Sequence, residues 1–201
     1  MSEKIILTKE FFIARGWERD CYINPLDSTK VIKITHGYSN KASRNQNDLE
    51  YKYFEYLKKL NKPFSHITKC YGYIDTNLGK GIVSDKVYDY NGKISMTFLD
   101  TITQNKFTKD EENELVEELK EYIFKNSILF IDIGLCNILC CEYEKEKYRL
   151  MIIDGLGAKR TGIKFWLYLK SELFTKYKIR KQWKRFLNKI DRKRKQYNKK
   201  V

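Results

Sequence analysis

Two oxygen-bearing side chains, Asp132 and Asn137, stand five positions apart inside an otherwise apolar run, FIDIGLCNILC at residues 130–140. A buried aspartate is costly and is rarely found unless it is paired or binds a metal. The segment is therefore either a loop at the surface or a place where these two residues have a ligand. Asp154, followed by Gly155 at the end of the run YRLMIID, adds a second carboxylate.

A lysine and a glutamate earlier in the chain supply further charges. Lys33 lies in the apolar strand pattern VIKI, and Glu50 follows 17 residues later inside a helical pattern. A lysine in a buried strand needs a counter-charge, which a glutamate on the adjoining helix can supply. One cation and several oxygen ligands are together what is needed to hold a nucleoside triphosphate with magnesium.

Each of these features also occurs in proteins where it has no function. A D-x4-N spacing arises by chance, a strand lysine can lie at a sheet edge, and Asp-Gly commonly marks a turn. Their order favours a functional interpretation: a strand lysine, a helix glutamate, D-x4-N after a later helix, and Asp-Gly at a strand end.

The first half of the chain predicts strands, one helix and more strands. Residues 5–34 carry β-branched and aromatic residues around the turn formers Asn24, Pro25 and Asp27. Ser43 with Gln46 resembles a capping box, which predicts a helix of four to five turns that ends before Pro63. Its predicted apolar face consists of Leu49, Tyr53, Leu57 and Leu60.

Two strand-like runs follow, KCYGYIDT and GIVSDKVYDY, with a turn at residues 77–81 between them. Thr108 with Glu111 predicts a second capped helix. Its apolar face would comprise Leu115, Leu119, Tyr122 and Ile123. The chain contains no internal repeat and no low-complexity linker, so we expect two lobes joined near residues 87–92 rather than independent domains.

The composition is that of an ordinary globular protein. The chain has 201 residues, of which 42% are hydrophobic and 33% charged. No apolar run reaches the ~18 residues of a membrane span, and MSEKIILTKEFF lacks the features of a signal peptide. We therefore expect a cytoplasmic protein. The five scattered cysteines favour reduced thiols over a zinc site.

The net charge of +14 is concentrated near the C-terminus. Residues 176–200 hold thirteen Lys or Arg and one acid, Asp191, which leaves +2 for the rest. This segment predicts a basic amphipathic helix. Its apolar stripe comprises Ile179, Trp183, Phe186, Leu187 and Ile190.

Three interpretations of this basic helix stay open. The stripe can pack on the fold with the charges in water, or adhere to an anionic membrane surface or glycolipid at the inner face of the membrane, or bind nucleic acid. The aromatic-rich stretch FWLYLKSELF upstream favours packing or membrane contact over recognition of bases.

The motifs together resemble a known series. VIKI, Glu50, IDIGLCN and IIDGLG are similar to the strand lysine, helix glutamate, catalytic loop and metal-binding segment of protein kinases. ARGWERDCYINP, KVIKI, LEYKYFEYL, NILC and DGLG resemble the YrbL family of PhoP-regulatory-network proteins, from about residue 5 to about residue 190.

The resemblance implies an α+β, protein-kinase-like two-lobed fold in a bacterial regulatory protein. A small β-rich N-lobe with one helix would span residues 1–88. A reduced, mainly helical C-lobe would span 89–175, and the basic amphipathic helix or tail would span 176–201.

The resemblance also assigns roles in binding ATP and Mg²⁺. Lys33 would contact the α- and β-phosphates, Glu50 would hold Lys33 in place, and Gly16 would lie in the segment that covers the phosphates. That segment, ARGWERDCY, has one glycine where kinases have several. Arg15 or Arg19 could replace the missing backbone contacts, or could be exposed surface arginines.

Asp132 would accept the proton of the attacking hydroxyl, and Asn137 and Asp154 would hold magnesium. Asp132 and Asn137 would then face a phosphate-and-metal cleft. Ile131, Ile133, Leu135 and Ile138 would anchor the loop in the core.

Other departures concern the substrate. Phe130 and Ile131 replace the His-Arg that usually precedes the catalytic aspartate, and Gly134 replaces a frequent lysine. No Ala-Pro-Glu follows, and 47 residues remain after Asp154. These departures favour a small-molecule, sugar or lipid-linked phosphate acceptor over a protein.

Three hypotheses follow. The leading one is a kinase-like phosphotransferase that uses Mg-ATP. The second is a kinase-fold pseudoenzyme, or pseudokinase, that binds nucleotide or a partner without chemistry. The third is a nucleic-acid- or membrane-binding module at residues 176–200.

Overall fold

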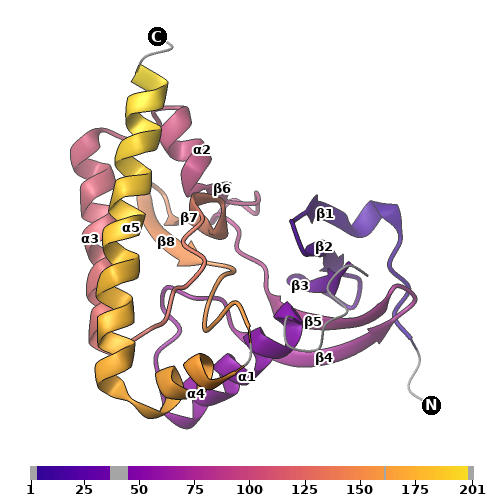
Figure 1. Ribbon diagram of the computed structural model, residues 1–201. Coiled ribbons are helices and arrows are strands. Elements are labelled where there is room, and N and C mark those ends of the chain that lie inside the picture. Colours follow the sequence, from indigo (N-terminus) through magenta and orange to yellow (C-terminus); the bar gives the residue numbers. More distant parts are fainter. Residues whose placement is uncertain (1–3, 37–44, 161, 199–201) are drawn as a thin grey trace. The chain divides into compact units, whose positions relative to one another are not determined.

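The computed structural model describes residues 4–36, 45–160 and 162–198 (Figure 1). The described chain divides into two compact units, each treated by itself below. Unit 1 comprises Met1–Lys62, Thr68–Lys86 and Lys159–Gly162, and unit 2 comprises Pro63–Ile67, Val87–Ala158 and Ile163–Val201.

Unit 1 is built on an antiparallel sheet in the order β1-β2-β3-β5-β4. One predicted turn follows Asn24 and joins neighbouring strands. The other, predicted at residues 77–81, is confined to residues 77 and 78, because the next strand begins at Gly79. The strands are β1 (Phe12–Arg15), β2 (Arg19–Asn24), β3 (Asp27–Thr35), β4 (Cys70–Thr76) and β5 (Gly79–Asp85). A 3₁₀ turn, η1 (Lys9–Phe11), precedes β1.

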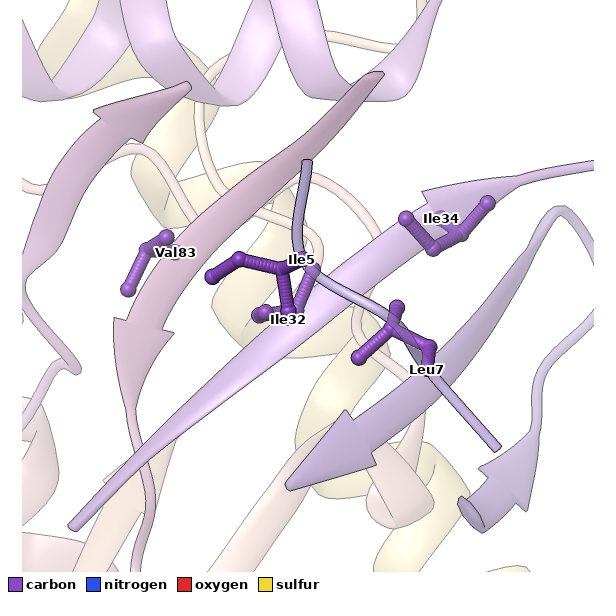
Figure 2. Packing of buried hydrophobic residues seen from close by; sticks show 5 residues of the cluster. All are labelled: Ile5, Leu7, Ile32, Ile34 and Val83. Atoms are coloured by element: carbon purple, nitrogen blue, oxygen red, sulfur yellow. The ribbon is translucent and has the colours of Figure 1, made fainter. Parts of the chain in front are cut away.

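One face of this sheet is covered by the N-terminal segment. Figure 2 shows Ile5 and Leu7 lying over Ile32 and Ile34 of β3 and Val83 of β5, and all five are buried. The backbone of Ile5 is held to β4 because its N–H donates to Asp75 O at 3.0 Å. The alternating apolar residues of the strands therefore form a core on one side of the sheet.

The helix of unit 1, α1 (Gln46–Lys59), begins after Asn45, whose side chain accepts hydrogen bonds from Asn47 N and Asp48 N. Its buried apolar residues are Leu49, Tyr53, Phe54 and Leu57. Leu60, predicted on this face, lies past the last helical turn and is exposed, because the helix ends one residue earlier. The predicted cap Ser43 lies outside the described residues.

Unit 2 contains a second antiparallel sheet in the order β6-β7-β8. Its strands are β6 (Met96–Thr97), β7 (Ile138–Glu144) and β8 (Lys147–Ile152). Helix α2 (Phe98–Thr103) follows β6. Helix α3 (Lys109–Asn126) begins with the predicted capping box, in which Thr108 and Glu111 bond each other's backbone N–H.

The basic C-terminal segment is part of the body of unit 2. After α4 (Ile163–Lys170), helix α5 (Glu172–Asn198) begins four residues before the predicted start of the tail at residue 176. Figure 1 shows α5 alongside α3, and Arg194 of α5 forms an ion pair of 2.5 Å with Glu112 of α3.

The apolar stripe of α5 is buried except at one position. Ile179, Trp183, Phe186 and Ile190 are buried, whereas Leu187 is 40% exposed. Phe186 packs against Phe98, Phe130 and Trp183, with ring centroids 5.1 to 6.4 Å apart. Four of the five residues of the stripe therefore pack on the fold, as the first of the three interpretations has it.

No described helix is both long enough and apolar enough to cross a bilayer. Burial raises the pKa of Cys70 to about 11 and that of Cys140 to about 12, so both thiols stay protonated at neutral pH. Protonated buried thiols are poor nucleophiles, which fits structural roles for these two residues.

Replacing Phe186 with alanine tests whether α5 belongs to the core. We expect Phe186→Ala to lower the free energy of unfolding by ~3–5 kcal/mol, because the ring is fully buried among three aromatic neighbours. Leu187→Ala, one residue away and 40% exposed, should cost less than about 1 kcal/mol. Urea denaturation measures both, and equal small losses would contradict the core assignment.

Candidate functional site

In unit 1 the two charges predicted to pair do so in a buried position. Lys33 Nζ of β3 donates to Glu50 Oε1 of α1 at 2.9 Å, and both residues are less than 10% exposed. Glu50 lies on the buried face of α1, together with Leu49 and Tyr53, and the packing of that face positions its carboxylate. The ion pair is thus present, while its role in binding phosphates stays a prediction.

Arg19 of β2 is a second cation on the same carboxylate. Its NH1 donates to Glu50 Oε2 at 2.6 Å and to Asn47 Oδ1 at 3.1 Å, and Arg19 is buried. Asn47 Nδ2 in turn donates to the backbone oxygen of Lys33 at 3.1 Å. Lys33, Arg19, Glu50 and Asn47 therefore form one hydrogen-bonded cluster that joins β2 and β3 to α1.

The turn that was expected to cover phosphates is short and closed by its own contacts. Gly16 N donates to Arg19 O at 2.7 Å, and a Cβ at Gly16 would lie 3.0 Å from that oxygen. Arg15 makes two hydrogen bonds of 2.9 Å to Asp20 across the base of the turn. This contact holds the pKa of Asp20 below its usual value.

The two arginines near this turn therefore differ. The Arg15 side chain is mostly exposed, as one of the two predicted interpretations has it. Arg19 is buried, and its side chain is held by the ion pair with Glu50. The expectation that Arg19 is an exposed surface arginine is wrong, whereas its contact with phosphates in place of loop amides stays a prediction.

In unit 2 the run that contains Asp132 is a surface loop on an apolar base. Ile131, Ile133, Leu135 and Ile138 are all buried, whereas Asp132 between them is exposed. A 3₁₀ turn, η4 (Leu135–Asn137), leads from the loop into β7. The predicted apolar anchors are confirmed, and they hold Asp132 on a rigid foundation.

The segment after β8 is bound to this loop through its backbone. Gly155 O accepts hydrogen bonds from Ile131 N at 2.8 Å and from Asp132 N at 3.0 Å. Gly155 has a φ of +83°, and a Cβ there would lie 2.6 Å from Asp132 O. Glycine is therefore required both by the left-handed conformation and by the close approach of the two backbones.

Asn137 and Asp154 are both joined to this backbone contact, one from the loop and the other from the position directly before Gly155. Asn137 Nδ2 donates to Asp132 O at 2.9 Å, so its Oδ1 is the atom that can serve as a ligand. Ile153 N donates to Asn137 O at 2.9 Å, and Asp154 Oδ1 accepts from Gly155 N at 2.6 Å. Unit 2 thus brings Asp132, Asn137 and Asp154 into one neighbourhood.

These donors suit magnesium in kind, because Mg²⁺ is bound by one or two protein oxygens together with phosphates and water. Among the described residues no group of three or more His, Cys, Asp or Glu side chains could hold a metal ion. A set of one amide and one carboxylate is smaller than such a group. It fits an ion that arrives with a nucleotide better than a permanently bound metal.

Two polar side chains of α5 hold the loop from its inner side. Gln182 donates to the backbone oxygen of Ile131, and Lys189 Nζ donates to that of Ile133 at 3.1 Å. These carbonyls flank Asp132. The C-terminal helix therefore fixes the path of the loop in addition to packing on the core.

Sequence reasoning missed Gln182 and Lys189, and it named Arg19 without its pairing with Glu50, although two signals were present. Gln182 interrupts the apolar stripe of α5, and a polar residue on a buried stripe needs a hydrogen-bond partner. Arg19 shares a sheet face with Lys33, since Cys21 lies opposite Lys33 and Arg19 is two residues from Cys21. Lys189 gives no comparable signal among the many basic residues around it.

The comparison with protein families agrees with the order of these motifs. The family model described as PhoP regulatory network protein YrbL matches residues 5–191. The chain belongs to the YrbL family. Two relatives, each an uncharacterized protein YrbL, come from Escherichia coli (strain K12) and Shigella flexneri. Each is 28% identical over 155 residues, which cover 76% of this chain and 73% of the relative.

Solved structures show the fold of this YrbL-family chain to be kinase-like. Rad53 in complex with AMP-PNP is similar with a TM-score of 0.50 and 20% identity, over 72% of this chain and 37% of that one. The kinase domain of Mycobacterium tuberculosis PknI gives a TM-score of 0.50 at 12% identity, over 72% and 57%. The chain thus spans less than two thirds of either kinase structure.

Gly155 offers a test of the close backbone approach in this YrbL-family loop. Gly155→Ala and Gly92→Ala should share the cost of a side chain at positive φ, ~1–2 kcal/mol, since both glycines have a φ of +83°. Gly155→Ala should lose a further ~1–3 kcal/mol, because its Cβ meets Asp132 O while nothing lies within 4 Å at Gly92. Equal losses in urea denaturation would contradict the constraint.

Arg19 can be tested against its exposed neighbour. Breaking a buried ion pair by removing one partner costs ~3–5 kcal/mol, and we expect Arg19→Met to fall at the lower end because Lys33 still neutralises Glu50. Arg15→Met, which removes a mostly exposed arginine and its two hydrogen bonds to Asp20, should cost much less than Arg19→Met. Similar effects of both variants, measured by urea denaturation, would refute the buried cluster.

Proposed function

We propose that the chain is a kinase-like phosphotransferase that transfers phosphate from Mg-ATP to a non-protein acceptor. The observation that carries the proposal is the buried pair of Lys33 and Glu50. A buried ion pair is weak as a source of stability, because desolvation offsets much of the attraction. Its presence supports a role for Lys33 in holding the α- and β-phosphates, with Glu50 fixing the position of the ammonium group.

The oxygen donors of unit 2 support the second part of the proposal. Asn137 Oδ1 and the carboxylate of Asp154 would hold Mg²⁺. When bound, the ion supplies charge neutralisation at the phosphate oxygens. The Gly155 contacts keep the backbone of both residues against the catalytic-type loop, so the donors are positioned before a nucleotide arrives.

Asp132 is the proposed base. It is exposed, so its carboxylate can reach a substrate hydroxyl and accept the proton as the oxygen attacks the terminal phosphate. The backbone on both sides of Asp132 is fixed by α5 through Gln182 and Lys189. Such support keeps a catalytic group within the narrow range of positions in which it is effective.

A small molecule, a sugar or a lipid-linked hydroxyl is the acceptor class that we propose. After Asp154 the described chain forms α4 and α5, and the apolar face of α5 is used to pack on unit 2. These helices therefore provide little surface for a peptide substrate near the loop. We propose that the reaction takes place in the cytoplasm, which contains both ATP and magnesium.

A pseudoenzyme that binds nucleotide without chemistry is the second candidate. The turn at Gly16 favours it, because its one glycine is engaged in a closing contact with Arg19 O. Without several glycines a backbone approaches phosphates less closely. Binding and turnover therefore have to be measured separately.

Nucleotide binding is tested by thermal unfolding with ATP and magnesium. At a ligand concentration near 100 times Kd, we expect a stabilisation of ~2.7 kcal/mol, or roughly 5–10 °C for a chain of this size. A chelator and Asp154→Asn should each remove the magnesium-dependent part. Asp110→Asn, on the exposed first turn of α3, is the control that should keep it.

Turnover is then measured as formation of ADP from ATP in the presence of a panel of small-molecule, sugar and lipid-linked hydroxyl acceptors. Asp132→Asn should lower it at least about 100-fold, the contribution expected of a general base, while the thermal shift remains. Turnover unchanged by Asp132→Asn would refute the phosphotransferase assignment. A thermal shift in the absence of any turnover would favour the pseudoenzyme.

A further inference from the structure

Large apolar side chains are exposed where α4 meets α5. Ile163 and Trp166 of α4 and Leu173, Phe174 and Tyr177 of α5 are 51% to 81% exposed. Figure 1 shows α4 joined to the first turns of α5 at one end of unit 2. We refer to these five residues as the α4–α5 corner. Exposed apolar side chains are ordinary when scattered, whereas several of them on two joined helices indicate an interaction surface.

The corner is held in a fixed geometry from beneath. Thr175 is buried, and its hydroxyl donates to Tyr168 O at 2.5 Å and contacts Ser171 O at 3.1 Å, which ties α5 back to α4. Phe165 is buried on the inner side of α4. Because inner residues anchor both helices, the outer residues are presented as a preformed surface.

The surroundings of the corner are strongly basic. Residues 163–185 contain eight Lys or Arg and one acid, Glu172, which is paired with Lys176 at 2.7 Å. Leu173, Tyr177, Lys181 and Lys184 recur at spacings of three or four along α5, so they share one side of the helix. Lys181 and Lys184 are exposed there. One continuous surface thus passes from apolar to cationic.

We propose that the α4–α5 corner docks the protein on the surface of an anionic phospholipid bilayer. Leucine, isoleucine and phenylalanine side chains enter the boundary between headgroups and acyl chains, whereas tryptophan and tyrosine suit the headgroup level itself. Lysines beside such residues are attracted to anionic lipids and keep their ammonium groups at the polar surface.

Two other occupants fit the observations less well. A nucleic acid could stack bases only on the three rings of the corner and would leave the aliphatic Leu173 and Ile163, its two most exposed members, in water. A second copy of the chain would bring the same cationic surface against itself, and like charges facing one another oppose such a contact. The corner and the lysines beside it therefore complement a surface that has both negative charge and accessible acyl chains, as an anionic bilayer does.

The experiment is co-sedimentation of the full chain with vesicles of phosphatidylcholine and phosphatidylglycerol in a two-to-one ratio, against vesicles of phosphatidylcholine alone. We expect partition to the anionic vesicles. Leu173→Ser with Phe174→Ser should weaken it roughly tenfold or more, because apolar burial is lost. Lys181→Glu with Lys184→Glu should weaken it by about fivefold or more per charge, the factor that corresponds to ~1 kcal/mol for each cation at an anionic surface.

Matched controls separate the corner from general effects. Lys109→Glu with Lys145→Glu makes the same change of charge at exposed positions on α3 and in the β7–β8 turn, and should lower partition less. Leu26→Ser removes a side chain that is 78% exposed in unit 1 and should leave partition unchanged. Since every substituted residue is exposed, circular dichroism and the ATP-dependent thermal shift should be those of the unaltered chain.

Three results would overturn the proposal. One is no partition to anionic vesicles at low ionic strength. Another is partition that is unchanged by Leu173→Ser with Phe174→Ser, because binding would then be explained by the net charge of the chain alone. The third is a concentration-dependent dimer, or binding to duplex DNA in preference to the vesicles, that the serine variant abolishes, because the corner would then serve another partner.

Discussion

The carbonyl oxygen of Gly155 accepts hydrogen bonds from two successive backbone amides, and the arrangement of the candidate site in unit 2 depends on this shared acceptor. It fixes the segment after β8 against the loop that follows α3. The same loop uses Asp132 O to bind Gly134 N and Asn137 Nδ2. Backbone N–H and C=O groups need hydrogen-bond partners, and here they find them within the loop and in the segment after β8. These hydrogen bonds, made by backbone groups and the Asn137 amide, fix the path of the chain around Asp132.

Unit 1 has a corresponding centre in Glu50, whose two oxygens accept from two different cations. Because Lys33 comes from β3 and Arg19 from β2, one carboxylate ties two strands to α1. Asn47 closes the cluster by binding Arg19 and the backbone of β3. The turn before β2 contains one glycine, Gly16. The buried Arg19 therefore anchors the first residue of β2, directly after that turn.

The features that sequence predicted well depend on local patterns. The capping box at Thr108 and Glu111 and the apolar anchors around Asp132 involve neighbours within a few residues, so their spacing identifies them. The pairing of Lys33 with Glu50 was expected from a simpler constraint, since a buried lysine requires a counter-charge. The kinase-like fold followed from the order of these motifs and is supported by solved structures.

The features that sequence did not predict depend on contacts between distant segments. Whether Arg19 is exposed depends on the helix that covers its strand, and Glu50 lies 31 residues away. The amphipathic pattern of α5 was correct, but the pattern could not identify the surface that its apolar face covers. Only the packing shows that this face meets Phe98 and Phe130, and that the exposed apolar residues lie at the α4–α5 corner instead.

The support of the loop by α5 has a consequence for biosynthesis. Gln182 and Lys189 follow their carbonyl partners by 51 and 56 residues, so the ribosome makes the loop well before the side chains that hold it. At ~5–20 residues per second, that interval lasts ~3–10 s. During this time Ile131 and Phe130 emerge without the helix that covers them. A chaperone that shields apolar segments of the nascent chain would therefore act on the loop that later presents Asp132.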